Sequence, residues 1–217
     1  MIDPLSHYLQ AWDLSDPQPL AETRTSIVYT VTHHDERVVL KLLKPYGWEE
    51  ANGAIALRAW GGRGAVQLLN VSADAHLLEY VPGDDLFLSL MQRGEDSAAT
   101  EIIAGVLNQL HAASPPVIPD ELPPLRTWFR ALYERARNTP DSVYERGARM
   151  ADFLLDAPLD EHVIHGDIHH WNIRRHPVRG WLAFDPKGLR GERTYDAANT
   201  LCNPDAMPEL VFNEARL

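Results

Sequence analysis

The stretch His165-Gly166-Asp167-Ile168-His169-His170-Trp171-Asn172 holds the densest cluster of polar, chemically active side chains in this 217-residue chain. Thirteen residues after Asn172 lies a second carboxylate, Asp185, in Phe184-Asp185-Pro186-Lys187-Gly188. One carboxylate can accept the proton of an attacking hydroxyl, while an amide and another carboxylate offer hard oxygen ligands to Mg²⁺. The pattern therefore predicts a phosphoryl-transfer site built from Asp167, Asn172 and Asp185, in which one carboxylate is the base and the amide and the other carboxylate hold the metal ion.

Short apolar runs precede both carboxylates. Residues 163–165 and 181–184 are strand candidates that flank the polar, histidine-rich loop. We expect them to form one small hairpin within an otherwise helical region. Because both acids follow strands, the strand ends would present them at a cleft.

A cation for the phosphates of a nucleotide is expected from the amino-terminal half. The β-branched runs 26–32 and 37–43 surround a short polar turn and predict a hairpin. Lys41 lies inside the second run, and a lysine buried in an apolar strand is costly without a partner or ligand. The alternative is an edge strand in which Lys41 points to water.

The chain divides near residue 82. Before it, a leading helix at 5–12, the hairpin, a helix at 48–60 and strands at 65–69 and 76–81 predict a small, mostly antiparallel sheet with one inserted helix. After it, Ile103, Val106, Leu107 and Leu110 have the spacing of a buried helical stripe, and further helices are expected at 125–137 and 141–155. We therefore predict an α+β chain with lobes at 1–81 and 82–217.

Composition excludes several classes of protein. Lys and Arg number 20 and Asp and Glu 31, so the formal charge of −11 argues against nucleic acid or an anionic membrane as the main partner. A single cysteine, Cys202, excludes an intramolecular disulfide framework and a Cys-rich zinc site. With no run of about 18 apolar residues and no secretory leader pattern, a cytoplasmic protein is expected. The oligomeric state stays open.

Three strings resemble a known family. His-x-Asp-x-x-x-x-Asn, a later Asp-x-x-Gly and an upstream strand lysine are similar to the protein-kinase-like set. GRGAVQLL (62–69), HGDIHHWNI (165–173) and DPKGLRGERTYDAAN (185–199) resemble the streptomycin kinase and hydroxyurea phosphotransferase branch of the aminoglycoside phosphotransferases. The resemblance covers about residues 20–204. It implies a two-lobed protein-kinase-like fold with a small antiparallel-sheet N-lobe for the nucleotide and a helical C-lobe for catalysis and the acceptor.

The resemblance also implies roles in the N-lobe. Lys41 would hold the α and β phosphates of ATP, steadied by Glu49 or Glu50. The phosphate loop, often glycine-rich in the family, reads Thr23-Arg24-Thr25-Ser26 here, so the hydroxyls of Thr25 and Ser26 would help to cradle phosphate. The backbone of Glu79, Tyr80 and Val81 would meet the adenine ring.

In the C-lobe, the resemblance implies that Asp167 is the catalytic base and that His169 lies near the γ-phosphate. Asn172 and Asp185 would hold Mg²⁺, and Asp196 would brace the catalytic loop. The family usually continues with several more helices beyond the Tyr195-Asp196 pair, so the resemblance implies a truncated C-lobe. The implied reaction is ATP-dependent phosphorylation of a hydroxyl on a small molecule, such as the aminoglycoside streptomycin.

Two alternatives remain open. A catalytically silent nucleotide-binding module would keep the fold without a usable acceptor site. A metal-dependent phosphoesterase is suggested by Gly166-Asp167-Ile168-His169, with His165, His169 and His170 as ligands of a transition metal. Such enzymes also need an Asn-His string, which the chain lacks.

Overall fold

The computed structural model describes residues 3–214. Its amino-terminal part is a five-stranded antiparallel sheet in the order β1-β2-β3-β5-β4. The strands are β1 (Ser15–Glu22), β2 (Ser26–His33), β3 (Glu36–Leu43), β4 (Leu68–Ser72) and β5 (Ala75–Glu79). Two helices accompany the sheet, α1 (Pro4–Ala11) and α2 (Ala51–Trp60), the latter preceded by a 3₁₀ turn at Trp48–Glu50. The expected hairpin and both helices are thereby confirmed.

Two strands differ from expectation. The sequence pattern does not predict β1, because Pro17 and Pro19 interrupt it; both are tolerated because β1 is an edge strand with two register shifts. The strand expected at 65–69 begins only at Leu68. Ala65 instead forms an isolated parallel bridge to Ala183, which joins the sheet to the helical part of the chain.

The alternation of side chains along β3 explains how a lysine enters an apolar strand. Val38, Leu40 and Leu42 are buried in one cluster with Tyr8 of α1, on one face of the sheet. Val39 and Lys41 point to the opposite face, which lines the cleft between the sheet and the helical part. The edge-strand alternative is wrong, because β3 lies at the centre of the sheet and Lys41 is buried.

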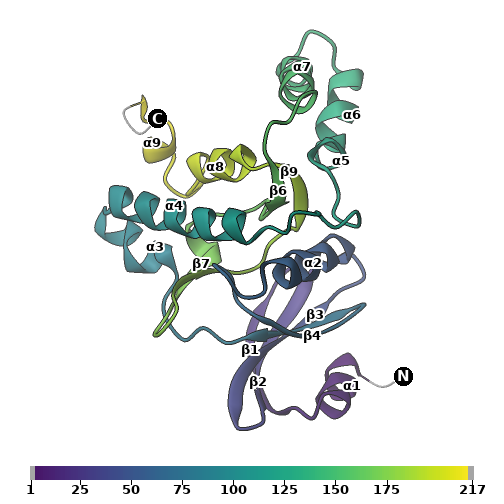
Figure 1. Ribbon diagram of the computed structural model, residues 1–217, viewed down its shortest axis with the longest axis vertical. Coiled ribbons are helices and arrows are strands. Elements are labelled where there is room, and N and C mark those ends of the chain that lie inside the picture. Colours follow the sequence, from purple (N-terminus) through teal and green to yellow (C-terminus); the bar gives the residue numbers. More distant parts are fainter. Residues whose placement is uncertain (1–2, 215–217) are drawn as a thin grey trace.

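The rest of the chain is mainly helical (Figure 1). Its helices are α3 (Leu86–Ser89), α4 (Asp96–Ala113), α5 (Leu125–Trp128), α6 (Arg130–Asn138), α7 (Val143–Leu155), α8 (Thr194–Leu201) and α9 (Pro208–Val211). The predicted stripe of α4 is confirmed, since Ile103, Val106, Leu107 and Leu110 are buried in the main core. No helix within residues 3–214 is both long and apolar enough to cross a membrane.

The two apolar runs around the polar loop do not form one hairpin. β6 (Glu161–Ile164) pairs with β9 (Leu189–Glu192), whereas β8 (Gly180–Ala183) pairs with β7 (Ile173–His176). Each run is short and apolar, so its own pattern does not specify its partner. The result is two small antiparallel sheets, and the loop that carries Asp167 and Asn172 runs between them.

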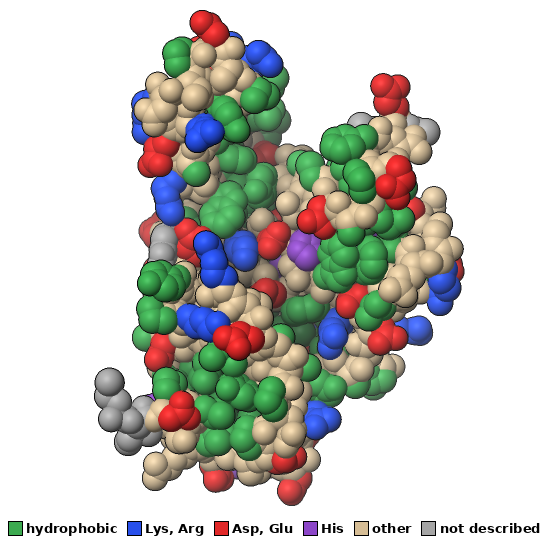
Figure 2. Space-filling model, turned by 180° about the vertical axis from the view of Figure 1, so that it is seen from behind, with side chains coloured by type: hydrophobic (Ala, Val, Ile, Leu, Met, Phe, Trp, Pro, Cys, Tyr) green, Lys and Arg blue, Asp and Glu red, His purple; other side chains and the backbone are tan. Residues whose placement is uncertain are grey.

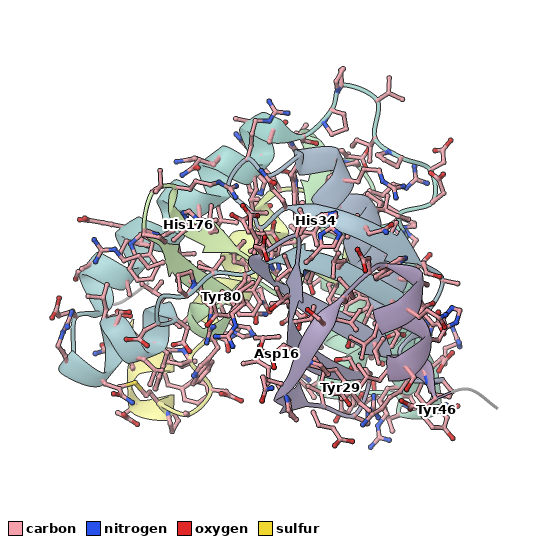
Figure 3. All side chains as sticks on the ribbon, turned by 90° about the horizontal axis from the view of Figure 1, so that it is seen from below. Asp16, Tyr29, His34, Tyr46, Tyr80 and His176 are labelled. Carbon is pink, nitrogen blue, oxygen red and sulfur yellow. The ribbon has the colours of Figure 1, made fainter. Side chains whose placement is uncertain are left out.

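A clasp at Arg179 joins the β7–β8 hairpin to the sheet. The Arg179 guanidinium donates to both carboxylate oxygens of Glu79, at the end of β5, and to the carbonyl oxygens of Gly62 and Ala65. His176 Nε2 lies 3.6 Å from Glu79 Oε1. Figure 3 labels Tyr80, which follows β5, and His176 of the hairpin, and both lie on the same side of the molecule. The clasp therefore fixes the connection between the two parts of the chain.

Removing the clasp should destabilise the protein. Arg179→Met keeps most of the aliphatic stem but leaves the largely buried Glu79 carboxylate without its cation. We expect the free energy of unfolding to fall by about 2–3 kcal/mol, measured by urea denaturation. Arg93→Met removes an exposed pair with Glu95 and is the control, with an expected change within about 0.5 kcal/mol. Equal losses of stability in Arg179→Met and Arg93→Met would show that the Arg179 clasp does not stabilise the fold.

A buried histidine beside Lys41 should make stability sensitive to acid. His76 of β5 pairs in register with Lys41, and burial followed by the Lys41 charge lowers its pKa from 6.5 to about 4. The unfolded chain therefore binds one more proton than the folded chain between these pH values. Stability should fall as the pH drops through this window, by about 1.4 kcal/mol per unit and about 3 kcal/mol in all.

His76→Leu should remove this contribution. Urea denaturation of the variant and the wild type at pH 7, 6 and 5 would show a flatter pH dependence in the variant, because a leucine binds no proton. The same slope in both proteins would show that His76 is not the responsible group.

Candidate active site

A cavity of about 340 Å³ lies between the sheet and the helical part. Most of its lining is apolar, from β1, β2, β3, the end of β5 and Phe184. Its polar side chains include Lys41 and Asp185. The lining residues are Leu20, Ala21, Thr23, Ser26, Val28, Val39, Lys41, Val66, Leu78, Glu79, Tyr80, Val81, Arg174, Phe184 and Asp185. An apolar slot with charged groups suits a flat ring that carries phosphates.

The charged groups form a network around Lys41. Its ammonium contacts carboxylate oxygens of both Glu50 and Asp185, and Asp185 is 144 residues away in sequence. Burial disfavours the charge on Lys41, but the two carboxylates outweigh it and raise the pKa of Lys41. Burial likewise disfavours the Asp185 anion, yet Lys41 lowers the pKa of Asp185. Lys41 and Asp185 are therefore held in their charged forms.

The choice between the two glutamates is decided by the turn that precedes α2. Glu50 is buried beside Lys41, whereas Glu49 pairs with Arg130 at 3.1 Å. The hydroxyl of Thr25 donates to Glu50 instead of lining the cavity. Ser26 does line the cavity, and its hydroxyl lies 3.1 Å from Thr23 Oγ1.

The buried carboxylate of Asp196 holds the start of the loop 165–172 in place. Asp196 of α8 accepts hydrogen bonds from the backbone N–H of His165 at 3.0 Å and of Gly166 at 2.8 Å. His165 is fully buried, and its Nε2 bonds the carbonyl of Phe184 at 3.1 Å, while its Nδ1 accepts from Asp167 N at 3.3 Å. Both ring nitrogens are thus engaged, so His165 is not available to a transition metal.

Asp167, His169 and Asn172 lie close together later in the same loop. Asn172 Nδ2 donates to the carbonyl of Asp167 at 2.9 Å and lies 3.1 Å from His169 Nε2. The Asp167 carboxylate stays partly exposed, with His169 Nε2 at 3.9 Å. The loop therefore fixes the backbone of Asp167 while its carboxylate remains accessible.

A backbone hydrogen bond brings the two predicted metal-binding residues toward one another. The Phe184 N–H donates to the Asn172 carbonyl at 3.0 Å, which ties the loop to the residue before Asp185. Asn172 is buried, and because its Nδ2 is committed to the Asp167 carbonyl, its Oδ1 is the atom left for a ligand. One amide oxygen and one carboxylate are hard donors that fit Mg²⁺. Among the described residues, no three His, Cys, Asp or Glu side chains are grouped to hold a metal ion by themselves.

The predicted hinge lies beside the cavity, at the end of β5 and in the residues that follow it. Glu79 and Val81 both line it. The carboxylate of Glu79 is committed to the Arg179 clasp and to the N–H of Gln67, 2.9 Å away. Its own N–H donates to the Gln67 carbonyl at 3.0 Å. The clasp and the hinge therefore share one residue.

The sequence pattern does not reveal the apolar walls of the cavity. Val28, Val39 and Leu78 come from three strands of the sheet, and Phe184 comes from the helical part. In the sequence such residues look like ordinary core, because a cavity wall and a core have the same hydrophobic pattern. Alternation along β3 is the one signal that could have found Val39, since it lies on the same face as Lys41.

Comparison with known proteins identifies the family. The model of the aminoglycoside/hydroxyurea antibiotic resistance kinase family matches residues 11–217. The streptomycin 3''-kinase of Klebsiella pneumoniae is 34% identical over 197 residues, which cover 91% of this chain and 72% of that protein. The hydroxyurea phosphotransferase of Kitasatospora aureofaciens is 30% identical over 216 residues, 92% of this chain and 60% of that protein. The chain thus spans between 60% and 72% of the length of these two relatives.

Solved structures agree on the fold. A thermostable mutant of aminoglycoside phosphotransferase APH(4)-Ia, in a ternary complex with ADP and hygromycin B, superposes with a TM-score of 0.63 at 17% identity. The match covers 95% of this chain and 83% of that one. The predicted two-lobed, protein-kinase-like α+β fold is confirmed, and by its sequence the chain belongs to the family of aminoglycoside/hydroxyurea antibiotic resistance kinases.

Proposed function

We propose that this chain transfers the γ-phosphoryl group of ATP to a hydroxyl of a small molecule. Two contacts together carry the proposal. Lys41 is paired with Glu50 and Asp185, and the residue before Asp185, Phe184, is hydrogen-bonded to Asn172 of the loop that also holds Asp167. The β3 lysine and Asp185 line the same cavity although they come from different parts of the chain. Nucleotide binding is further supported by the apolar slot.

In this proposal the adenine ring lies between the apolar walls, against the backbone of Glu79 to Val81. The phosphates extend toward Lys41, which is already charged and held in place by its two carboxylates. Ser26 lies on the cavity wall as a hydroxyl donor for phosphate, whereas Thr25 positions Glu50. The chain's own residues thus supply a slot for the base and a fixed cation for the phosphates.

Asn172 and Asp185 would hold Mg²⁺, which when bound neutralises charge on the phosphates. Asp167 stands outside that pair, partly exposed, where its carboxylate can accept the proton of an incoming hydroxyl. Asp196 and Asn172 hold the backbone around Asp167 and fix the position of the base. Fixed geometry matters, because a displacement of about 1 Å can cost on the order of 10²-fold in rate.

The acceptor would approach from the open side of the Asp167 loop. Figure 2 shows a hollow between the projecting α5–α7 unit and the α8–α9 region, with acidic, basic and histidine side chains exposed at its base. The side chains of Asn199 and Thr200 on α8 both contact the Ile168 carbonyl, at 3.0 and 3.4 Å, which ties one wall to the catalytic loop. We propose that the acceptor bound in this hollow is streptomycin, which the name of one relative gives, or hydroxyurea, which the name of the other gives.

The direct test is ATP consumption by the purified chain with streptomycin, hydroxyurea or no acceptor. A product whose mass is increased by one phosphoryl group would support the proposal, and NMR of that product would identify the modified hydroxyl. Binding of MgATP without transfer to any acceptor would favour a silent nucleotide-binding module. ATP as donor is consistent with the cytoplasmic location expected from the sequence.

Substitutions of Asp185 and Asp167 should have different effects on MgATP affinity and on phosphoryl transfer. Asp185→Asn removes a charged ligand and a partner of Lys41, so the affinity for MgATP should fall by at least about tenfold. Asp167→Asn should leave that affinity within about twofold while transfer falls by about 10²-fold or more, because the base acts on the acceptor. Calorimetric titration with MgATP and product assays would measure the two effects.

Lys41→Ala provides the matched comparison in the nucleotide site. We expect it to weaken MgATP binding by about tenfold or more, since a charged phosphate contact contributes about 1.5–3 kcal/mol. Unchanged affinity in Lys41→Ala would remove Lys41 from the site. A strong loss of MgATP affinity in Asp167→Asn would instead place Asp167 on the nucleotide and contradict its assignment as base.

A further inference from the structure

The lysines of this chain are few and lie close to the site. Of 20 basic residues only three are lysine: Lys41, Lys44 and Lys187. Lys41 lies in the cavity, and the Lys44 ammonium donates to the Thr23 carbonyl in the phosphate loop at 2.7 Å. Lys187 Nζ lies 3.6 Å from Asp167 Oδ2. A lysine presents a compact point charge, a property suited to phosphate, and Lys187 is placed outside the nucleotide cavity, on the acceptor side.

The backbone of Lys187 is fixed. Its N–H donates to the carbonyl of His165 at 2.9 Å, so it is attached to the start of the catalytic loop. The next residue, Gly188, has φ +65°, and a Cβ there would collide with the carbonyl oxygen of Asn52 in α2. This close approach requires glycine and holds the segment after Asp185 against α2. Lys187 therefore projects from a rigid base.

The ammonium of Lys187, in contrast, keeps hydrogen-bond donors available for a ligand. Its distance of 3.6 Å from Asp167 is within ion-pair range but longer than a hydrogen bond. Within residues 3–214, Asp167 is the one carboxylate found within 4 Å of it. Its side chain is 27% exposed. The charge is thus located beside the base and accessible to a ligand there.

The charge balance of the site favours an anionic ligand at this point. Lys41 already faces two carboxylates, Glu50 and Asp185, which offset its charge. On the acceptor side Asp167 adds another negative charge, which would repel an incoming phosphoryl group. Lys187 is the cation beside Asp167 that can compensate for this repulsion.

We propose that Lys187 is a catalytic residue whose ammonium contacts the phosphoryl group during transfer. The inference rests on the proposed function and deepens it. The bond between the γ-phosphorus and the bridging oxygen breaks, and ADP keeps the electron pair. The acceptor oxygen forms the new bond to phosphorus, and its proton passes to Asp167. Lys187 donates to an oxygen of the phosphoryl group, whose negative charge must be stabilised in the transition state.

The test compares Lys187→Ala and Lys187→Arg with the wild type in the full chain. Arg149→Ala, which removes an exposed pair with Glu145 on α7, is the surface control. For Lys187→Ala we expect kcat to fall by about 10²-fold, with the KM for ATP and the calorimetric affinity for MgADP within about threefold of wild type. Lys187→Arg should recover at least about tenfold of that loss because it restores a donor cation.

A second measurement does not depend on turnover. MgADP with aluminium fluoride imitates the planar phosphoryl group in transfer, and a transition-state analogue should bind more tightly than MgADP alone. We expect the wild type to gain about tenfold or more in affinity when aluminium fluoride is added, and Lys187→Ala to gain little. An equal gain in both proteins, or no gain in the wild type, would overturn the proposal.

The outcomes separate this inference from the proposed function. If the wild type transfers phosphate to no acceptor, the proposed function fails, and the aluminium fluoride comparison still decides whether Lys187 contacts the phosphoryl group. A kcat for Lys187→Ala within about threefold of wild type would overturn the catalytic role. A parallel loss of MgADP affinity would also overturn it, since that result indicates a structural contribution.

Discussion

The contact of the Lys41 ammonium with Asp185 is the interaction on which the arrangement of the site depends. Lys41 is in the central strand of the sheet, and Asp185 follows β8 in the helical part, so their ion pair spans the cleft between the two. A buried lysine without carboxylates would be costly, and the raised pKa of Lys41 shows that Asp185 and Glu50 outweigh this cost. The cavity walls and the catalytic loop are positioned around that pair.

Two further sets of contacts fix the β7–β8 hairpin and the catalytic loop in position. The Arg179 clasp joins the β7–β8 hairpin to the end of β5, at the hinge end of the cavity. Asp196 supports the loop of Asp167 from α8. Because β8 leads directly into Asp185, a hairpin held at its tip by Arg179 also limits where that carboxylate can lie. The site is thus built from a few long-range polar contacts between these parts of the chain.

Local patterns predict much of this arrangement, and the failures have physical causes. The β2–β3 hairpin, the stripe of α4 and the segment 165–172 can be predicted because each is contiguous or periodic in the sequence. β1 cannot, because its prolines obscure the pattern. The separate partners of β6 and β8 cannot either, because short apolar runs do not encode their pairing.

The site shows the same limit. Glu49 and Glu50 are indistinguishable in sequence, and only the geometry of the turn before α2 directs Glu50 to Lys41 and Glu49 to Arg130. The Arg179 clasp has no sequence signature, because its partners at 62, 65 and 79 lie far from it in the chain. Long-range polar contacts of this kind depend on the assembled fold and leave no local signal.

A double-mutant cycle would measure the coupling between Lys41 and Asp185 across the cleft. The free energy of unfolding would be measured by urea denaturation, without nucleotide, for Lys41→Met, Asp185→Asn and the double variant. Asp185 retains some exposure to water in the cavity, which weakens the pair relative to a fully buried one. If this ion pair holds the two parts together, the double variant loses less stability than the sum of the single losses, by about 1 kcal/mol or more. Additivity within about 0.3 kcal/mol would contradict it.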